Sequence, residues 1–305
     1  MRKAGSSGRR SLFRRSLSSL SRMRDSRTPV ALAIAGSDSG GGAGIQADLK
    51  AFARCGVHGA TAIVALTAQN TVAVSDVMQV PPAMIAAQVE SVVSDISVDA
   101  IKIGMLGSAE TAQAVAGSLE KVEGVPVVVD PVMISESGSR LLDPEALQVL
   151  VERIIPGAAV ITPNLPEAAR LLGREGEVSE ADQEEMARAL LDLGPEAVIV
   201  TGGHTTAGDD LLFDGSELTR VSGVRHPDGA AHGSGCTHAS ALAAGLAIGL
   251  EVERAARLAR TVASEAVGQG LTSLGAGAGP VSAHDLVEAR EWARSAAGVG
   301  DPTSA

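Results

Sequence analysis

Residues 231–250 read AHGSGCTHASALAAGLAIGL, a glycine turn that runs into a stretch of small apolar residues. The pattern predicts a tight turn over Gly233-Ser234-Gly235 followed by a helix. The first turn of a helix leaves backbone N–H groups unpaired and carries the positive end of the helix dipole. Glycines let such a backbone close around an anion, because no Cβ stands in the way. The stretch is therefore either an anion-binding turn or a glycine turn before a closely packed helix.

Cys236 lies in the first turn of this predicted helix. The positive end of a helix dipole favours a thiolate, so we expect a lowered thiol pKa at this position. An anion-binding turn with a candidate base at its edge points to phosphate chemistry. The alternative is a buried cysteine that only packs.

The rest of the chain alternates short apolar runs with helical patterns. Runs such as VALAIA (30–35) and AVIVT (197–201) are typical of strands buried on both faces. Strands that alternate with helices at this spacing predict an α/β fold, with a mostly parallel sheet and helices on both faces. Further strands are expected at 60–67, 99–104, 125–130 and 158–162, an extended flap at 71–80, a hairpin at 210–221, and helices at 45–54, 84–96, 109–119, 144–154, 179–193 and 251–268.

The carboxyl ends of the predicted strands carry glycines, amides, acids and one cysteine. Parallel strands joined by right-handed crossovers place these ends at one edge of the sheet, where open α/β sheets bind ligands. We therefore expect a single ligand crevice formed by Gly36–Gly44, Gln69, Met105, Asp130, Asn164, Gly202 and Gly233–Cys236.

A second glycine-rich loop, GSDSGGGAG at 36–44, follows the first predicted strand. It does not match a P-loop, because Gly42-Ala43 stand where Lys and Ser or Thr are required. It does not match the dinucleotide fingerprint either, since Ile45 replaces the third glycine. The glycines can still let a small ligand approach the backbone. Asp48, one turn into the helix, is then either an acceptor facing that ligand or a solvated first-turn carboxylate.

The segment TPNLPE at 162–167 predicts the start of another helix. Asn164 is a favoured N-cap, Pro166 is tolerated in the first turn, and Glu167 occupies the capping-box position. On pattern alone, capping accounts for both Asn164 and Glu167.

Composition excludes several classes of partner. The net charge of −11 argues against binding to phosphate backbones, and the absence of Tyr, with one Trp and three Phe, argues against base-stacking surfaces. We therefore expect no nucleic-acid partner. No apolar run reaches the ~18 residues of a membrane span, so we expect no membrane partner either. Two distant cysteines, Cys55 and Cys236, fit a reducing compartment, and we expect a cytoplasmic protein.

Residues 1–28 differ from the rest of the chain. They hold eight Arg and one Lys against one Asp, a charge of +8 that leaves −19 on the remainder. Ser and Arg dominate and apolar periodicity is almost lacking, which predicts a disordered basic tail. The tail is similar to a transit peptide in composition, or is a plain basic extension. We favour the simpler interpretation that the native start is Met23.

Seven motifs, in order along the chain, carry a family resemblance. The chain resembles the hydroxymethylpyrimidine/phosphomethylpyrimidine kinases of thiamine biosynthesis, which belong to the ribokinase-like superfamily. The resemblance implies a ribokinase-like three-layer sandwich and one kinase domain over 29–297. The motifs are AGSDSGGGAGIQADLKAF (35–52), LTAQNT (66–71), KIGML (102–106), DPVM (130–133), ITPNLPEA (161–168), GGH (202–204) and HGSGCT (232–237).

The resemblance implies an ATP-dependent phosphotransferase that uses Mg²⁺. Its substrate would be 4-amino-5-hydroxymethyl-2-methylpyrimidine, phosphorylated on the hydroxymethyl group, and then the resulting monophosphate. The implied site residues are Asp48, Gln69, Gly36, Met105 and Val132 for the pyrimidine; Gly233, Ser234, Gly235 and Cys236 for the anion hole, with Cys236 at the catalytic position; Asn164, Glu167, Thr201 and Gly203 for ATP and its phosphates; and Asp130 and Glu167 for the metal.

Cys236 has a specific expected role in this scheme. In the first phosphorylation a neutral alcohol must lose a proton, which a thiolate can accept. In the second, the acceptor is already an ionised phosphate and needs no base. We therefore expect Cys236→Ala to impair the first step more than the second.

Three positions depart from the pattern that the resemblance implies. Thr201 stands where related enzymes often carry a Lys that contacts ATP, which leaves Arg225, His226 or a main-chain group as substitutes. The glycine-rich loop at 275–279 lacks the usual Lys, and Ser39-Gly40 replaces Pro-Ser. His232 and His238, which flank the turn, are expected to cap or pack rather than bind a metal.

Two other functions stay open on the sequence. One is a pyridoxal kinase-like enzyme of the same fold, and the other, from a different class, is a non-catalytic pyrimidine-binding sensor domain. Turnover assays with the pyrimidine, its monophosphate and pyridoxal distinguish them. The resemblance and the flap at 71–80 also predict a homodimer.

Overall fold

The computed structural model describes residues 27–283, apart from 137, 139, 177, 204, 206 and 207. Most of the predicted basic tail, the final predicted helix with Trp292 and the last residue of the GGH motif lie outside the described residues.

A nine-stranded sheet forms the centre of the molecule, in the order β3-β2-β1-β4-β5-β6-β7-β8-β9. Six neighbouring strands run parallel: β2, β1, β4, β5, β6 and β7. In contrast, β3 at one edge and β8 and β9 at the other edge pair antiparallel with their neighbours. The predicted α/β class with a mostly parallel sheet is confirmed. The strands are β1 (Val30–Asp38), β2 (His58–Gln69), β3 (Val74–Gln79), β4 (Ala100–Ile103), β5 (Val127–Val129), β6 (Val160–Ile161), β7 (Ala197–Val200), β8 (Asp210–Phe213) and β9 (Leu218–Val221).

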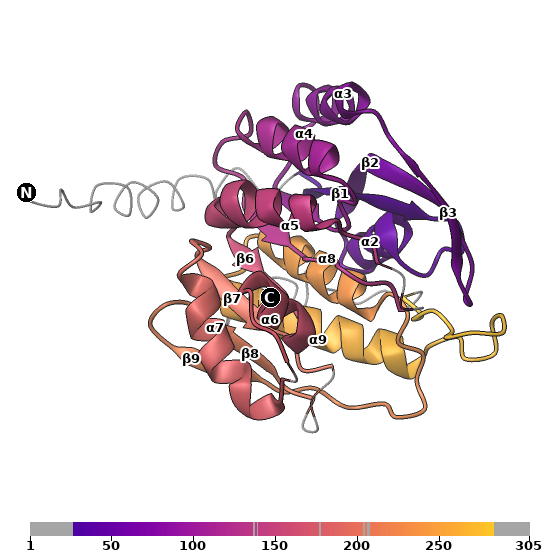
Figure 1. Cartoon of the computed structure of the whole chain (residues 1–305), viewed down its shortest axis with the longest axis vertical. Helices are drawn as coiled ribbons and strands as arrows, with labels where there is room; N and C mark the ends of the chain where they lie inside the picture. Colours follow the sequence, from indigo (N-terminus) through magenta and orange to yellow (C-terminus); the bar gives the residue numbers. More distant parts are fainter. Residues whose placement is uncertain are drawn as a thin grey trace, which may run out of the picture.

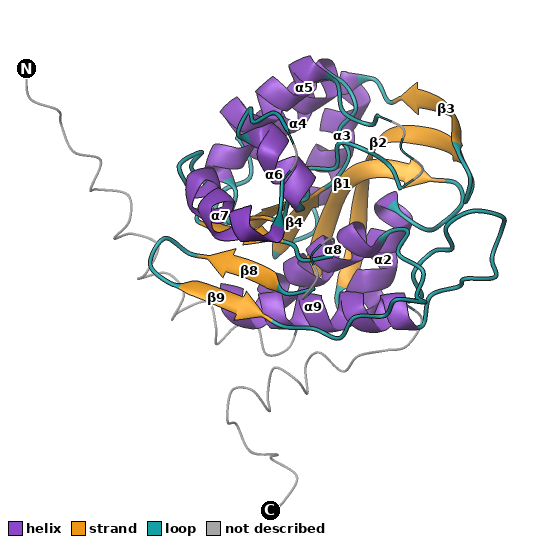
Figure 2. Cartoon of the chain, turned by 60° about the horizontal axis from the view of Figure 1, so that its bottom comes forward, coloured by secondary structure: helices purple, strands orange, loops and turns teal. Residues whose placement is uncertain are grey.

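Helices cover both faces of this sheet, which gives three layers (Figure 1, Figure 2). On one face lie α3 (Pro82–Val93), α4 (Ala109–Leu119), α5 (Pro144–Val149), α6 (Leu165–Leu171) and α7 (Gln183–Leu191). On the other lie α2 (Gly44–Arg54), α8 (Ser234–Ala247) and α9 (Val252–Gly268). The helix predicted over 144–154 passes into a π-helical turn at Leu150–Ile154, and the one predicted over 179–193 begins with a 3₁₀ turn at Glu180–Asp182.

Alternation along β1 divides the apolar core in two. Leu32 and Ile34 pack under the α3–α7 layer, whereas Ala31 and Ala33 pack under α2, α8 and α9. Because small residues fill α8, that helix contacts β1, β4 and β5 in the middle of the sheet. In the described part of the chain, every helix falls short of the length and apolarity that crossing a membrane requires.

The sheet topology determines where a ligand can bind. The carboxyl ends of the parallel strands meet at one edge, and α2 and α8 begin there with their amino ends. The loops after β1, β2, β4, β5, β6 and β7 therefore gather around the start of α8.

Candidate active site

A cavity of about 430 Å³ opens at this edge of the sheet. Its walls include the ends of several strands and the start of α8, as the alternation of strands and helices predicts. Every site residue that the family resemblance implies lines it, except Asp48. Those that line it are Gly36, Gln69, Met105, Asp130, Val132, Asn164, Glu167, Thr201, Gly203, Gly233, Ser234, Gly235 and Cys236. Of the crevice expected from the strand ends, residues 39–42 and Gly202 do not line it.

Residues 233–236, called here the Gly233 turn, form the amino end of α8. Gly233 is the N-cap and has a left-handed φ of 85°. A Cβ at this position would lie 1.8 Å from the carbonyl oxygen of Gly42, so only glycine fits. The backbone amides of Gly235 and Cys236 have no acceptor within the described part of the chain. The turn therefore offers free N–H donors and a helix dipole to an anion.

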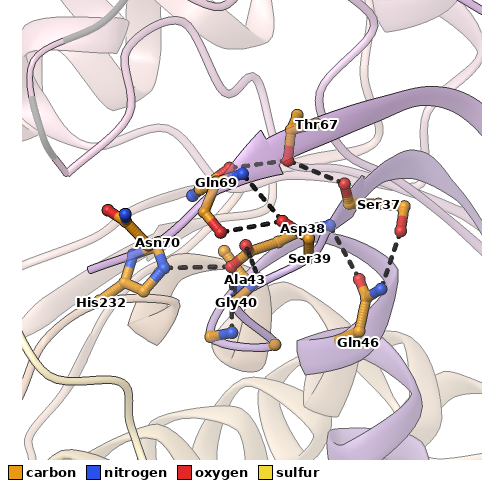
Figure 3. A network of polar contacts seen from close by, with 12 residues as sticks. Ser37, Asp38, Ser39, Gly40, Ala43, Gln46, Thr67, Gln69, Asn70 and His232 are labelled. Atoms are coloured by element: carbon orange, nitrogen blue, oxygen red, sulfur yellow. Dashed lines mark hydrogen bonds and ion pairs between the residues drawn. The ribbon is translucent and has the colours of Figure 1, made fainter. Parts of the chain in front are cut away.

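Residues 40–43, called here the Gly40 turn, lie beside it and are filled from within. The Asp38 carboxylate accepts hydrogen bonds from the amides of Gly40 (2.8 Å), Gly42 (3.0 Å) and Ala43 (2.8 Å). Figure 3 shows this carboxylate at the centre of the turn. Burial alone would raise the pKa of Asp38, but hydrogen bonds from His232 and from the amides outweigh burial and hold it below its ordinary value.

His232, the residue before Gly233, completes the contact between the two turns. Its Nε2 lies 3.2 Å from Oδ2 of Asp38 (Figure 3). Its ring also lies where a side chain at Gly42 would stand, 2.3 Å from the position of a Cβ there. The expected packing role of His232 is thus accompanied by a specific ionic partner, which the sequence did not reveal.

A buried ammonium group lies below the cavity, at Lys102 on β4. Its Nζ is 2.8 Å from Oδ1 of Asp48 and 3.6 Å from Oδ2 of Asp130, and its side chain is 0% exposed. Burial alone would lower the pKa of Lys102, but the neighbouring carboxylates, first Asp48 and then Asp130, raise it above its ordinary value. Lys102 therefore carries a positive charge beneath the Gly233 turn. A lysine inside the apolar strand AIKI was the sequence signal for this group.

The structure corrects the expected position of Asp48. Its carboxylate is neither solvated nor exposed in the cavity, because it points between α2 and α8 and is 0% exposed. There it accepts hydrogen bonds from Lys102 and from the Ser240 hydroxyl (2.7 Å). Both bonds use Oδ1 of Asp48, and Oδ2 has no hydrogen-bond partner among the described residues.

The expected pKa of Cys236 is also wrong in sign. Burial raises the pKa of its thiol to about 12, which outweighs the lowering by Lys102; Asp130 and Asp48 add to the increase. The lowering by the Gly44 amide does not offset this increase. Cys236 is thus a neutral thiol near pH 7.

The predicted capping box at the start of α6 is confirmed. The amide of Glu167 donates to Oδ1 of Asn164 (2.9 Å), and the amide of Asn164 donates to Oε2 of Glu167 (3.0 Å). Both residues nevertheless line the cavity. Burial, followed by repulsion from Asp130, raises the pKa of Glu167 to about 8.

Two carboxylates that repel each other in this way fit a divalent cation. Oδ2 of Asp130 is buried and has no hydrogen-bond partner within the described residues. Although no cluster of three or more metal-ligating side chains occurs among those residues, Mg²⁺ commonly takes one or two carboxylates together with substrate phosphates. Asp130 and Glu167 therefore meet the requirements of such a site.

Gly36, Met105, Val132 and Gln69 also line the cavity. A Cβ at Gly36 would lie 2.6 Å from Cε of Met105, so a glycine is needed for the methionine methyl group to pack this close to β1. The hydroxyl of Thr67 lies 3.0 Å from the carbonyl oxygen of Ser37 and 3.1 Å from Oε1 of Gln69, and its single proton can be donated to either oxygen.

The cavity wall that includes Thr201, where related enzymes often carry a lysine, contains other basic residues. Arg225 and His226 both line it, as expected of substitutes. Arg260 on α9 is a further cation that the sequence did not single out; its guanidinium donates to the carbonyl of Gly208 (2.6 Å).

A second histidine–carboxylate pair, His238 and Asp210, also lines the cavity. Nε2 of His238 on α8 lies 2.9 Å from Oδ2 of Asp210, and Oδ1 of Asp210 accepts a hydrogen bond from the amide of Gly202. His238 was expected to cap or pack, and it does so through this buried carboxylate.

The chain is similar to kinases of known sequence and structure. A family model described as phosphomethylpyrimidine kinase matches residues 38–282. A hydroxymethylpyrimidine/phosphomethylpyrimidine kinase of Rhizobium meliloti is 46% identical over 257 residues, which cover 83% of this chain and 96% of the relative. The crystal structure of phosphomethylpyrimidine kinase from Clostridium difficile has a TM-score of 0.68 and 40% identity, covering 76% of this chain and 96% of that one. The pyridoxal kinase of Staphylococcus aureus in complex with AMP-PCP and pyridoxal has a TM-score of 0.77 and 33% identity. The match covers 85% of this chain and 94% of that one.

Proposed function

Because the chain belongs to the phosphomethylpyrimidine kinase family, we propose that it phosphorylates hydroxymethylpyrimidine and then phosphomethylpyrimidine, with one kinase domain over 29–297. The observation that carries this proposal is the composition of one cavity. It combines free amides at the Gly233 turn, two carboxylates at Asp130 and Glu167, and an apolar lining at Met105 and Val132. These are an anion site, a cation site and an acceptor site within reach of one another.

The Gly233 turn is the group that acts on the transferring phosphoryl. Phosphoryl transfer passes through a loose transition state, so positioning and charge stabilisation provide most of the catalysis. The amides of Gly235 and Cys236 supply donors at a helix start, and the ammonium of Lys102 adds a buried positive charge beneath them. This arrangement replaces the lysine that a P-loop would contribute.

The acceptor ring is proposed to lie against Met105 and Val132, with Gln69 hydrogen-bonding its amino edge. The side-chain amide of Gln69 offers one acceptor and one NH2 donor group, so a pyrimidine that presents a donor and an acceptor side by side is recognised. Asp48 contributes by holding Lys102 in place.

Cys236 is proposed to act as a donor and not as a base. A thiol with a pKa raised to about 12 is protonated at neutral pH, so it cannot accept the hydroxyl proton in the ground state. A neutral thiol can donate a weak hydrogen bond to a phosphoryl oxygen. This role is the same whether the acceptor is an alcohol or a phosphate.

The donor is ATP, since an ATP analogue occupies a kinase of the same fold at 33% identity. We propose that Mg²⁺ is held by Asp130 and Glu167, where it would neutralise charge on the phosphate oxygens. Arg225, His226 and Arg260 are proposed to face the nucleotide in place of a lysine at Thr201. The two cysteines, Cys55 and Cys236, are unpaired, which fits the cytoplasmic location that we propose.

ATP consumption by the full chain tests the proposed function. We expect turnover with hydroxymethylpyrimidine and with its monophosphate, and a diphosphate product on the second step by ³¹P NMR. Pyridoxal is the alternative acceptor, because the pyridoxal kinase shares the fold at a TM-score of 0.77. Turnover of pyridoxal alone would replace the proposed substrate. Binding of the pyrimidine without any ATP consumption would favour the sensor-domain alternative.

A homodimer is proposed through the free edge of β3. Among the strands of the described residues, β3 pairs with β2 alone and stands at the end of the sheet (Figure 1). Val72, Met78 and Met84 are each more than half exposed around it, and an apolar edge strand of this kind favours pairing with another copy. Light scattering should give the mass of two chains for the wild type and of one chain for Met78→Asp. A monomeric wild type would contradict this proposal.

A further inference from the structure

One carboxylate joins the two glycine turns of the cavity. The Asp38 carboxylate accepts hydrogen bonds from three amides of the Gly40 turn. Its Oδ2 also lies within hydrogen-bond distance of the imidazole Nε2 of His232. Asp38 is 3% exposed and His232 is 8% exposed, so both are enclosed. In Figure 3 the carboxylate lies between the Gly40 turn and the imidazole, and Ser39 and Gln69 bond to each other beside it.

The two turns also touch directly. The carbonyl of Gly42 occupies the space that a Cβ at Gly233 would need. The backbone of His232 is fixed on its other side, because its carbonyl accepts the amide of Val281 (3.0 Å). A change at the Asp38–His232 contact would therefore displace the Gly233 turn relative to the acceptor wall.

We propose that Asp38 and His232 are a pair of positioning residues that hold the acceptor side of the cavity in line with the Gly233 turn. This inference rests on the phosphoryl transfer proposed above. Neither side chain needs to touch a reacting atom. Their effect is geometric, and misplacement of reacting groups by about 1 Å can reduce a rate by about a hundredfold.

The same carboxylate determines which turn is available to a phosphate. The amides of the Gly40 turn already bond to a fixed negative charge, so a second anion there would meet repulsion and find no free donor. The pKa of Asp38 is held below its ordinary value, so this charge is present at neutral pH. The Gly233 turn has no such internal anion among the described residues, and the transferring phosphate is directed to it.

The first test separates positioning from folding. His232→Leu removes the imidazole donor, whereas His232→Gln keeps an N–H at similar reach. In the full chain we expect His232→Leu to lose about tenfold to a hundredfold in kcat, with KM for ATP and for the pyrimidine changed less than about threefold. His232→Gln should recover most of that loss. His58→Leu, at an exposed position at the start of β2, is the matched control and should keep wild-type kcat.

The second test asks whether the two residues act as a unit. Asp38→Asn places an amide donor against the amides of the Gly40 turn and should also lower kcat. If the two residues are coupled and act together, the kcat of the double variant Asp38→Asn/His232→Leu is about as low as that of the slower single variant. Thermal unfolding and AMP-PCP binding by calorimetry establish that each variant is folded and binds nucleotide.

Three outcomes would overturn the inference: multiplicative losses in the double variant, a change in KM with kcat preserved, or no recovery by His232→Gln. If the wild type itself consumes no ATP with any acceptor, the proposed function fails instead. An active wild type with unaffected His232→Leu kinetics contradicts the positioning role alone.

Discussion

The Gly40 turn and the Gly233 turn are both glycine-rich, both precede a helix on the same face of the sheet, and touch each other at Gly42 and Gly233. The first encloses the carboxylate of Asp38, which uses its amides. The second leaves the amides of Gly235 and Cys236 free within the described part of the chain and has the ammonium of Lys102 below it. A glycine turn at a helix start is therefore an anion site only when the protein has not supplied the anion itself.

The largest expected effect comes from removing the charge below the second turn. Lys102→Met leaves Asp48 and Asp130 as buried carboxylates without their cation. We expect a loss of roughly 3–5 kcal/mol in the free energy of unfolding, measured by urea denaturation at neutral pH.

The double variant Asp48→Asn/Lys102→Met is the control, because it removes one of the stranded charges. It should recover part of the lost stability. A Lys102→Met protein as stable as the wild type would show that the ammonium is not needed to hold these carboxylates.

The next largest effect is expected from giving the Gly233 turn a carboxylate of its own, as the Gly40 turn has in Asp38. A Cβ at Gly235 meets no atom within 4 Å, so Gly235→Asp can place a carboxylate at the anion site. An acid in the first turn of a helix is favourable for folding, whereas repulsion of a phosphate is worth several kcal/mol. We expect kcat/KM for ATP to fall by about a hundredfold or more while the melting temperature is maintained.

Gly235→Asn is the matched control, since it has the same size without the charge. Its loss should be much smaller than that of Gly235→Asp. Equal losses in the two variants would mean that space, not charge, distinguishes the turns.

A smaller effect is expected at Cys236. Because its thiol is protonated, Cys236→Ala removes a weak donor and no base. We expect about a tenfold loss in the single-turnover rates of both phosphorylation steps, less than the loss of a full oxyanion-hole donor, and recovery with Cys236→Ser. A loss confined to the alcohol step would restore the thiolate base that the sequence predicted.

The smallest effect concerns pH and Mg²⁺. A carboxyl whose pKa is about 8 when folded stabilises the protein fully below its unfolded pKa and loses that contribution as pH rises through about 8. Mg²⁺ binds the ionised form, so it should raise the melting temperature more at about pH 8.5 than at about pH 6. Glu167→Gln, which can keep the capping box, should abolish this difference. A pH-independent Mg²⁺ effect would contradict the assignment of Glu167.

The sequence predicted the elements of this site better than their charges. Strand ends, the capping box of Asn164 and Glu167 and the glycine turns all follow from local pattern, which acts over a few residues. Which way Asp48 points depends on the packing of α2 against α8, a contact between residues 192 positions apart. The pKa of Cys236 depends on its burial near Asp130 and Asp48, and no single segment contains that information.

The contact between Asp38 and His232 could likewise not be predicted from local sequence pattern. Each stands inside a motif that the sequence singled out, yet their contact joins positions 194 residues apart. Only the fold brings the end of β1 to the start of α8. Lys102 was the one residue with a local signal, a charge in a buried strand, that the sequence argument left unused.

The position of the transferring phosphate tests the central claim most directly. A crystal structure of the full chain with ADP, tetrafluoroaluminate and hydroxymethylpyrimidine would locate the phosphoryl mimic. We expect it within hydrogen-bond distance of the amides of Gly235 and Cys236, with the Asp38 carboxylate still bound in the Gly40 turn. A mimic bound to the amides of residues 40–43, with Asp38 displaced, would contradict the account.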